Sequence, residues 1–286
     1  MLIKLELFEG YVVLMRILDS QIKDTVKRMV LIPIFQGDYE AAVSSLPQIL
    51  DLLYAQIPQN RRVSFGRVYT IKVLSDYIYN QLANRNVAVY PIASQLYELS
   101  HEEWAKGVVL GVLSHHGLRN LQDVLPHFTK AATSSKWEIR EFTQMFFRKL
   151  IGKYPDELRT YLLTAVKSED ANMRRFVAET LRPVQENQWI YLKPEYSVSI
   201  LRYLFTEVEA YPRTAVGNNL SDLARRLPEC VYELVEELVQ SGDKNSYWIA
   251  YRACRNLVKE EPLKIMNLLG IDEYRYKKQI YRRRDY

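Results

Sequence analysis

The apolar residues of this chain recur every three to four positions along almost its whole length, which is the period of one face of an α-helix. This spacing predicts helices over residues 20–35, 39–56, 62–83, 101–115, 120–132, 137–153, 155–167, 172–182, 195–208, 211–226, 229–240, 246–259 and 262–269. Short breaks of turn-forming residues, such as QGD at 36 and SGDKN at 241, separate them. No alternating stretch predicts a sheet, and glycine is scarce, with 10 residues in 286. We therefore predict an all-α fold.

Helix pairs recur in the second half of the chain. The segments IREFTQMFFRKLIGKYP (139–155), PRTAVGNNLSDLARRLP (212–228) and YWIAYRACRNLVKEEP (247–262) each read as a helix that ends in a polar turn and a proline, and a second amphipathic helix follows each. Pro155, Pro228 and Pro262 lie 73 and 34 residues apart, close to two periods and one period of about 36 residues. The missing unit begins at NMRRFVAETLRP (172–183). Such pairs stack into a HEAT- or armadillo-like superhelix with a concave face.

The positive charge is concentrated at the C-terminal end. Of 39 Lys and Arg and 34 Asp and Glu, residues 274–286 hold six and one, so residues 1–273 hold 33 of each and the net charge of +5 belongs to the tail. Cations interleaved with tyrosines suit a nucleic-acid backbone, and the alternative is a solvated, partly disordered terminus. We expect an N-terminal helical extension over 1–118, HEAT-like repeats over 119–270 and a basic aromatic tail over 271–286.

Several classes of protein are excluded. No apolar stretch approaches the length of about 20 residues that a membrane span needs, and Lys4 is followed by mixed polarity rather than by a signal peptide. Cys230 and Cys254 lie in helix-patterned apolar stretches, so we expect reduced core thiols and a cytoplasmic protein. The four histidines lack ligand spacing for zinc, and we predict no metal site; they are His101, His115, His116 and His127.

Arginines open the first helix of each repeat: Arg140, Arg174 with Arg175, Arg213 and Arg252. Equivalent positions of stacked repeats line one face, and a row of guanidiniums there could follow a phosphodiester backbone. The alternative is an internal ladder of basic and acidic groups that joins neighbouring repeats.

The same helices carry polar residues opposite their apolar stripes. One such row is Trp137, Glu141, Gln144 and Arg148, beside the stripe of Ile139, Phe142, Phe146 and Leu150. The next two rows are Arg175, Glu179 and Arg182, and then Asn218, Asp222 and Arg225. Asn218, Asn219, Ser221 and Asp222 are poor helix-interior residues, so their presence in a well-patterned helix needs a reason.

The segments WEIREF, NMRRFVAETLRP and YPRTAVGNNLSDLARRLPE resemble the AlkC/AlkD superfamily of HEAT-like alkylpurine DNA glycosylases, more closely the AlkC branch, over residues 130–265. The resemblance implies hydrolysis of the N-glycosidic bond of cationic N3- or N7-alkylated purines in duplex DNA. It also implies a DNA repair enzyme of the 3-methyladenine type that acts as a monomer, without a metal or organic cofactor.

The resemblance also implies a site. Glu141 would be the catalytic carboxylate, with Asp222 close to it, and Trp137 would pack against the deoxyribose. Arg174 or Arg175 would hold a phosphate, and the polar residues at 218–222 would line the DNA-binding cleft. The DNA-binding set is Trp137, Arg140, Arg174, Arg175, Arg182, Arg213 and Asn218.

Three positions depart from the family pattern, and two alternatives follow. Trp189 is displaced, Asn218 stands where a tryptophan is expected, and Leu181 stands where a glycine is expected. Fewer cleft aromatics would weaken sugar stacking, so a relative that recognises damaged or branched DNA without excision is the first alternative. The second is a HEAT-type scaffold that binds a protein, for which no strong salt dependence of DNA affinity is expected.

Overall fold

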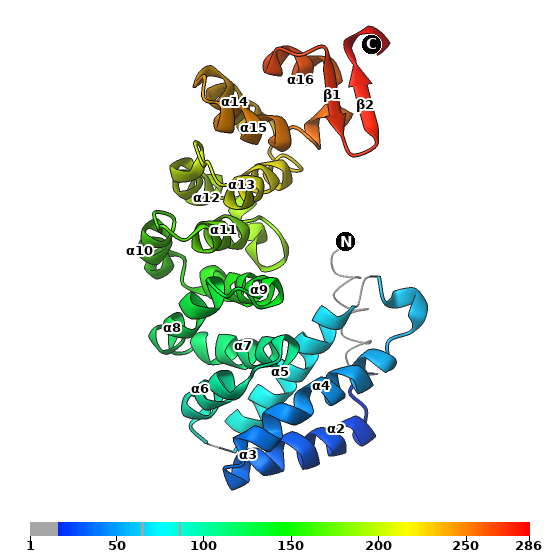
Figure 1. The fold of residues 1–286 in the computed structure, drawn as a ribbon, viewed down its shortest axis with the longest axis vertical. Helices are drawn as coiled ribbons and strands as arrows, with labels where there is room; N and C mark the ends of the chain where they lie inside the picture. Colours follow the sequence, from blue (N-terminus) through cyan, green and yellow to red (C-terminus); the bar gives the residue numbers. More distant parts are fainter. Residues whose placement is uncertain (1–16, 64–65, 86) are drawn as a thin grey trace. The chain divides into compact units, whose positions relative to one another are not determined.

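The computed structural model describes residues 17–63, 66–85 and 87–286. Their regular secondary structure is helical apart from one short hairpin, which confirms the all-α helical-repeat prediction (Figure 1). The chain forms two compact units, Met1–Phe146 and Phe147–Tyr286, which we call unit 1 and unit 2. The division falls inside one helix, α9 (Trp137–Lys153). The boundaries drawn from the sequence at 118 and 270 stay predictions, and Lys4 lies outside the described residues.

Unit 1 consists of helices that pack around α4 and α7. Its described helices are α2 (Ser20–Val26), a π-turn (Lys27–Leu31), α3 (Ile32–Gln36), α4 (Tyr39–Ala55), α5 (Arg67–Ala83), α6 (Val89–Leu99), α7 (Glu103–Gly117) and α8 (Leu121–Ala132), followed by the first part of α9. Among the described residues, α4 packs against α2, α5, α6 and α7. The sequence prediction missed α6, and it began the preceding helix five residues before Arg67.

Glycines set the helix spacing around α7. A Cβ atom at Gly107 would lie 2.7 Å from Cδ2 of Phe142, and one at Gly111 would lie 2.8 Å from Cζ of Phe146. Distances this short are below van der Waals contact, so α7 approaches the apolar face of α9 where α7 has no side chain. The predicted stripe of α9 is buried as expected, at Ile139, Phe142, Phe146 and Leu150.

Unit 2 consists of successive helix pairs. Its helices are α10 (Pro155–Ala165), α11 (Ala171–Thr180), α12 (Pro194–Leu201), α13 (Ala210–Leu223), α14 (Pro228–Gln240), α15 (Lys244–Ala253) and α16 (Pro262–Leu269), with short 3₁₀ turns between some of them. The first helices pack side by side, α11 on α13 and α13 on α15, while α10, α12 and α14 lie along their other side (Figure 1).

The prolines mark the second helix of each pair. Pro155, Pro228 and Pro262 each stand in the first turn of a helix, as predicted, where a missing N–H costs little. Pro194 opens α12 in the same way. It supplies the missing period, because it lies 39 residues after Pro155 and 34 residues before Pro228.

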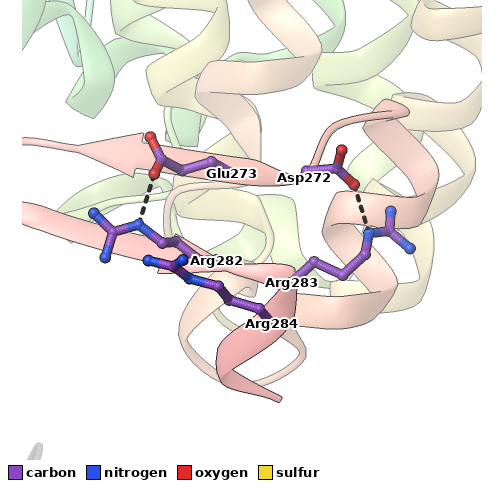
Figure 2. A pocket seen from close by; sticks show the side chains of 5 residues that line it. All are labelled: Asp272, Glu273, Arg282, Arg283 and Arg284. Carbon is purple, nitrogen blue, oxygen red and sulfur yellow. Dashed lines mark hydrogen bonds and ion pairs between the residues drawn. The ribbon is translucent and has the colours of Figure 1, made fainter.

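The C-terminal tail is folded, contrary to the expectation of no sheet. Strands β1 (Glu273–Tyr276) and β2 (Gln279–Arg282) form an antiparallel hairpin. Tyr274 is fully buried, stacks on Tyr251 of α15 with ring centroids 4.3 Å apart, and donates its hydroxyl to the Tyr251 carbonyl at 2.7 Å. One buried tyrosine therefore anchors a segment whose other residues are mostly exposed. Figure 2 shows the basic end of this hairpin, where Arg282 pairs with Glu273 and Arg283 with Asp272.

The described helices include none that is both long enough and apolar enough to cross a membrane. Both cysteines are free; Cys254 is buried and Cys230 is partly exposed.

Candidate nucleic-acid interface

Three arginines occupy the same place in consecutive first helices. Arg140, Arg174 and Arg213 are each the fourth residue of their helix, and each bonds carbonyl groups of the loop just before it. Arg174 also forms a bidentate pair with Glu207, at 2.6 and 3.0 Å, and Arg213 donates to Asn245. The contacts of Arg174 and Arg213 join a helix to the residues at the start of the next repeat, which is the geometry expected for a ladder between neighbouring repeats.

Arg252 does not occupy the equivalent position in its helix. It is the ninth residue of α15, and the fourth is Tyr247, whose hydroxyl donates to the Leu269 carbonyl. Arg252 instead donates Nε to Oδ1 of Asn218 at 2.9 Å, and Arg255, one turn on, donates to the same oxygen at 2.6 Å. The row of equivalent arginines therefore has three members, and α15 contributes to a different cluster.

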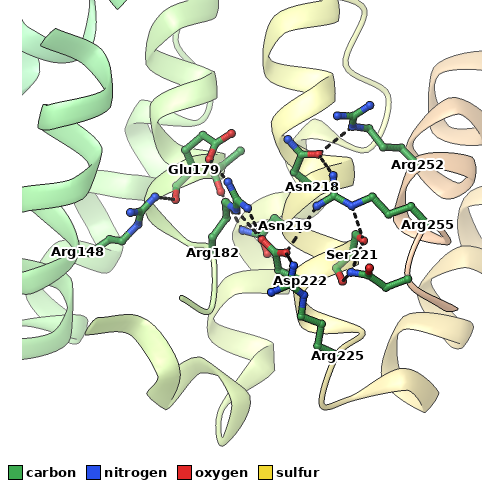
Figure 3. A network of polar contacts seen from close by, with 12 residues as sticks. Arg148, Glu179, Arg182, Asn218, Asn219, Ser221, Asp222, Arg225, Arg252 and Arg255 are labelled. Carbon is green, nitrogen blue, oxygen red and sulfur yellow. Dashed lines mark hydrogen bonds and ion pairs between the residues drawn. The ribbon is translucent and has the colours of Figure 1, made fainter. Parts of the chain in front are cut away.

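That cluster, which we call the arginine network, lies between α11, α13 and α15 (Figure 3). It contains two buried carboxylates, Glu179 and Asp222, which are 2 % and 1 % exposed. Asp222 lies within ion-pair distance of Arg182, Arg225 at 3.3 Å and Arg255 at 3.6 Å. Arg182 also bonds Glu179 at 2.9 Å, so one guanidinium bridges both acids and both helices.

The arginine network has more cations than anions. Among its labelled members in Figure 3, the four guanidiniums of Arg182, Arg225, Arg252 and Arg255 face the two carboxylates. Pairing therefore leaves surplus guanidinium charge, and Arg225, whose side chain is 60 % exposed, carries part of it to solvent. Planar guanidiniums bind phosphate groups through paired hydrogen bonds, so the surplus can bind an anionic backbone.

The electrostatics of the arginine network differ from one arginine to the next. Burial alone would lower the pKa of Arg182, but Glu179 and Asp222 outweigh it and raise that pKa above its usual value. Burial and the neighbouring charge of Arg255 lower the pKa of Arg252. Arg182 is therefore held by compensating acids, whereas Arg252 lies against another cation.

The polar row of α13 is mostly buried, which corrects the expectation that all of it lines a cleft. Asn219, Ser221 and Asp222 are almost fully buried, and only Asn218 is partly exposed. Asn219 donates to the Ala178 carbonyl on α11 at 2.9 Å, whereas Ser221 accepts from Arg255, in the turn just after α15, at 2.8 Å. The poor helix formers are present because α13 is enclosed by polar neighbours on both sides.

Trp137 and Glu141 lie one turn apart at the start of α9, in unit 1. The Trp137 side chain is 61 % exposed, which is unusual for a residue of its size. Glu141 is partly exposed, and its Oε2 accepts a hydrogen bond from Gln144. An exposed indole beside a reachable carboxylate is an arrangement that can contact a sugar and place a negative charge near it.

Arg175 belongs to the arginine network through Glu179, at 3.3 Å, and also lies over the Tyr211 ring at 4.1 Å. Two further contributors were not predicted from the sequence: Trp248 on α15 and Arg255 just after it. The Trp248 ring lies beneath both Arg213 and Arg252, at 5.0 and 5.5 Å. Their signal was present as the i, i+4, i+7 spacing of Trp248, Arg252 and Arg255.

Across the described ranges, no group of three or more His, Cys, Asp or Glu side chains is placed to hold a metal ion.

Comparisons with known proteins identify the fold. No protein-family profile matches the sequence, and no curated protein matches it. The alkylpurine DNA glycosylase AlkC of Pseudomonas fluorescens, bound to DNA containing an abasic site analog, aligns with a TM-score of 0.58 at 15% identity, over 87% of this chain and 68% of its own. AlkD2 from Streptococcus mutans aligns with a TM-score of 0.52 at 17% identity, over 74% of this chain and 98% of its own. The predicted resemblance to the AlkC/AlkD superfamily is thus confirmed at the level of the fold.

Proposed function

We propose that this chain is a DNA repair glycosylase that binds duplex DNA and hydrolyses the N-glycosidic bond of cationic N3- or N7-alkylated purines. The observation that carries the proposal is the fold shared with AlkC, whose solved structure holds DNA with an abasic site analog. The chain would act as a cytoplasmic monomer.

Binding would rest on the arginine network. Its surplus of guanidiniums over carboxylates favours a phosphodiester backbone, and the exposed Arg225 carries part of that charge to solvent. Arg174 and Arg213 of unit 2 would contribute to it through their charge while they join neighbouring repeats, and Arg140 of unit 1 would contact DNA by itself. Asn218 and Arg175 would complete this surface.

The chemistry would rest on Glu141. A cationic alkylated purine is already a good leaving group, so the barrier lies in the positive charge that develops on the sugar. A fixed carboxylate stabilises that charge and orients a water molecule. Gln144 donates to Oε2 of Glu141 and so orients the carboxylate, and the exposed Trp137 ring would pack against the deoxyribose.

Asp222, expected from the sequence to act beside Glu141, fits a positioning role better. Three guanidiniums compensate its charge, and it is almost fully buried. A compensated carboxylate stabilises an oxocarbenium ion poorly, whereas it holds Arg182 and Arg255 in place well. We therefore assign the chemistry to Glu141 and the arrangement of the arginines to Asp222.

The test is release of methylated purines from alkylated duplex DNA by wild type and by Glu141→Gln. We expect Glu141→Gln to lower the single-turnover excision rate by about 10²-fold or more, with little change in affinity for undamaged duplex. The control is Glu157→Gln, which removes an exposed carboxylate from α10 and should leave excision unchanged. Equal rates for wild type and Glu141→Gln would remove Glu141 from the mechanism.

One observation favours a second candidate, DNA recognition without excision. Asn218, at the position where the resemblance expects a cleft tryptophan, is bonded to Arg252 and Arg255, so it is held in the arginine network and offers no stacking surface. Salt-dependent binding of duplex DNA without any release of methylated bases, in wild type, would establish this candidate instead.

A further inference from the structure

The C-terminal hairpin is firmly mounted on unit 2. Besides the buried Tyr274, the Tyr251 hydroxyl accepts from the Arg275 backbone N–H at 2.7 Å and donates to the Arg275 carbonyl at 2.9 Å. Arg283 bonds Asn267 of α16. The hairpin is thus joined to α15 and α16 by side-chain and backbone contacts, and its tip has a defined place.

The acidic groups of the hairpin lie at its base. Glu273 binds Arg275 and, at 2.8 Å, Arg282, and Asp272 pairs with Arg283 at 2.9 Å. An open pocket of about 580 Å³ at this end is lined by two carboxylates and three arginines: Asp272, Glu273, Arg282, Arg283 and Arg284 (Figure 2). The base is largely self-neutralised, and the pocket holds no strong uncompensated charge for a separate ligand.

The tip carries the uncompensated charge. Lys277 and Lys278 are exposed, and within the described part of the chain neither has an ion-pair partner. Lys277 has φ of 56°, a left-handed conformation that glycine or asparagine usually fills at a hairpin turn. A lysine there costs on the order of 1 kcal/mol of backbone strain, so the tip bears a cation where a neutral glycine would be more stable.

The tip is also next to the arginine network. Tyr276, the last residue of β1, lies under the guanidinium of Arg255 at 5.9 Å, and Arg255 in turn contacts Asp222 and Asn218. The positive charge therefore continues from the arginine network on α13 and α15 to the two lysines of the hairpin, within a single compact unit.

We propose that this hairpin is a second docking element for the backbone of duplex DNA, which contacts phosphates through Lys277 and Lys278 and takes no part in the chemistry. The partner rests on the proposed function, and the complementarity is that of an uncompensated cationic tip for a polyanion. Each lysine that contacts a phosphate displaces condensed counterions, so the hairpin would add salt-dependent affinity that does not depend on sequence or lesion.

The test is the variant Lys277→Gly/Lys278→Gln, with binding to undamaged duplex DNA measured across a series of salt concentrations. Glycine relieves the strained φ at 277, so the hairpin should remain folded, which circular dichroism and thermal unfolding would verify. We expect the slope of log affinity against log salt to become shallower by about 2, close to 0.9 for each lysine. The matched control is Lys193→Gln/Lys259→Gln, which removes the same charge from two exposed lysines elsewhere in unit 2 and should leave the slope unchanged.

The outcomes separate this proposal from the glycosylase proposal. An unchanged slope in the hairpin variant, or an equal change in the control, would overturn the docking role even if wild type excises methylated purines. A shallower slope in a protein that excises nothing would leave the hairpin as a DNA contact and remove the glycosylase. A wild type without affinity for duplex DNA would overturn both, and a fall in the single-turnover excision rate at saturating enzyme would contradict the separation of the hairpin from the chemistry.

Discussion

The two units pair their carboxylates with different cationic side chains, arginine in unit 2 and histidine in unit 1. In unit 2, buried Asp222 and Glu179 are paired with guanidiniums, which cannot lose their charge in a protein. In unit 1, histidines take the corresponding role: His115 pairs with Asp76 and stacks on Tyr79, with ring centroids 5.0 Å apart. The carboxylates of the first arrangement are almost fully buried, whereas the Asp76 side chain of the second is 38 % exposed. This difference predicts how each unit responds to mutation and to pH.

The contrast between the units is tested most directly by comparing the stability of Asp222→Ala with that of Asp76→Ala. Removing Asp222 leaves the partly buried Arg255 without its acid and Arg182 with Glu179 alone, at a cost of about 3 kcal/mol in the free energy of unfolding. Removing Asp76 should cost about 1 kcal/mol or less, because its side chain is 38 % exposed and its pairing with His115 is screened by solvent. Urea unfolding of both variants and of Glu233→Ala, an exposed control on α14, measures this. Equal losses for Asp222 and Asp76 would contradict the contrast.

Close helix contacts offer a second, smaller test. At Gly107 of unit 1, an added Cβ would meet the Phe142 ring, with Cδ2 at 2.7 Å, in a closely packed core. At Gly217 of unit 2, it would meet the Arg252 stem, at 2.9 Å from Cβ and from Cδ. We expect Gly107→Ala to destabilise by about 1–3 kcal/mol through overpacking.

For Gly217→Ala, the Arg252 Cδ can rotate away but the Cβ at 2.9 Å is fixed to the backbone, so the gain in helix propensity of about 1 kcal/mol offsets only part of the clash. We expect a smaller loss of stability than for Gly107→Ala. The rotation would also weaken the Arg252 contact with Asn218 and lower DNA affinity. Thermal unfolding and duplex binding of the two variants separate these effects, and a larger loss of stability for Gly217→Ala would reverse the order that we expect.

The helices were largely predictable because burial against a partner helix leaves a period in the sequence. The predicted range 137–153 coincides with α9, and the predicted 262–269 coincides with α16. The hairpin was not predictable in this way, because four-residue strands are too short to show alternation and a single tyrosine, Tyr274, anchors them. The helix α6 has buried Val89, Ala93, Leu96 and Tyr97 at helical spacing, and Pro91 in its first turn obscured it.

The sequence predicted which polar residues belong to the candidate site, but it did not predict that most of them are buried. A period of 3.6 shows which face of α13 packs against its own partner helix, and Val216 and Leu220 are buried there as predicted. It does not show that the opposite face is covered as well, by α11 on one side and α15 on the other. Asn219 and Asp222 were therefore identified as polar partners, while their burial depends on neighbouring repeats that lie about 40 residues away in the sequence.

The smallest expected effect is a difference in acid sensitivity between the units. Burial, with a further contribution from Lys130, lowers the pKa of His127, and Glu98 only partly offsets this. A histidine whose folded pKa lies below its unfolded value of about 6.5 contributes stability that is present above that pH and is lost as the pH falls through the folded pKa. His127 Nε2 lies 3.1 Å from Ser94 Oγ, and the Tyr97 ring meets the imidazole edge-on, so protonation would disturb the packing of α8 on α6.

We expect hydrogen exchange of α8 amides to report a lower opening free energy at pH 5.5 than at pH 7, with a smaller change in α14, where the neighbouring groups are not histidines. His127→Gln should flatten the α8 response, because glutamine does not titrate, and an α8 response that survives this substitution would assign the acid sensitivity to another group.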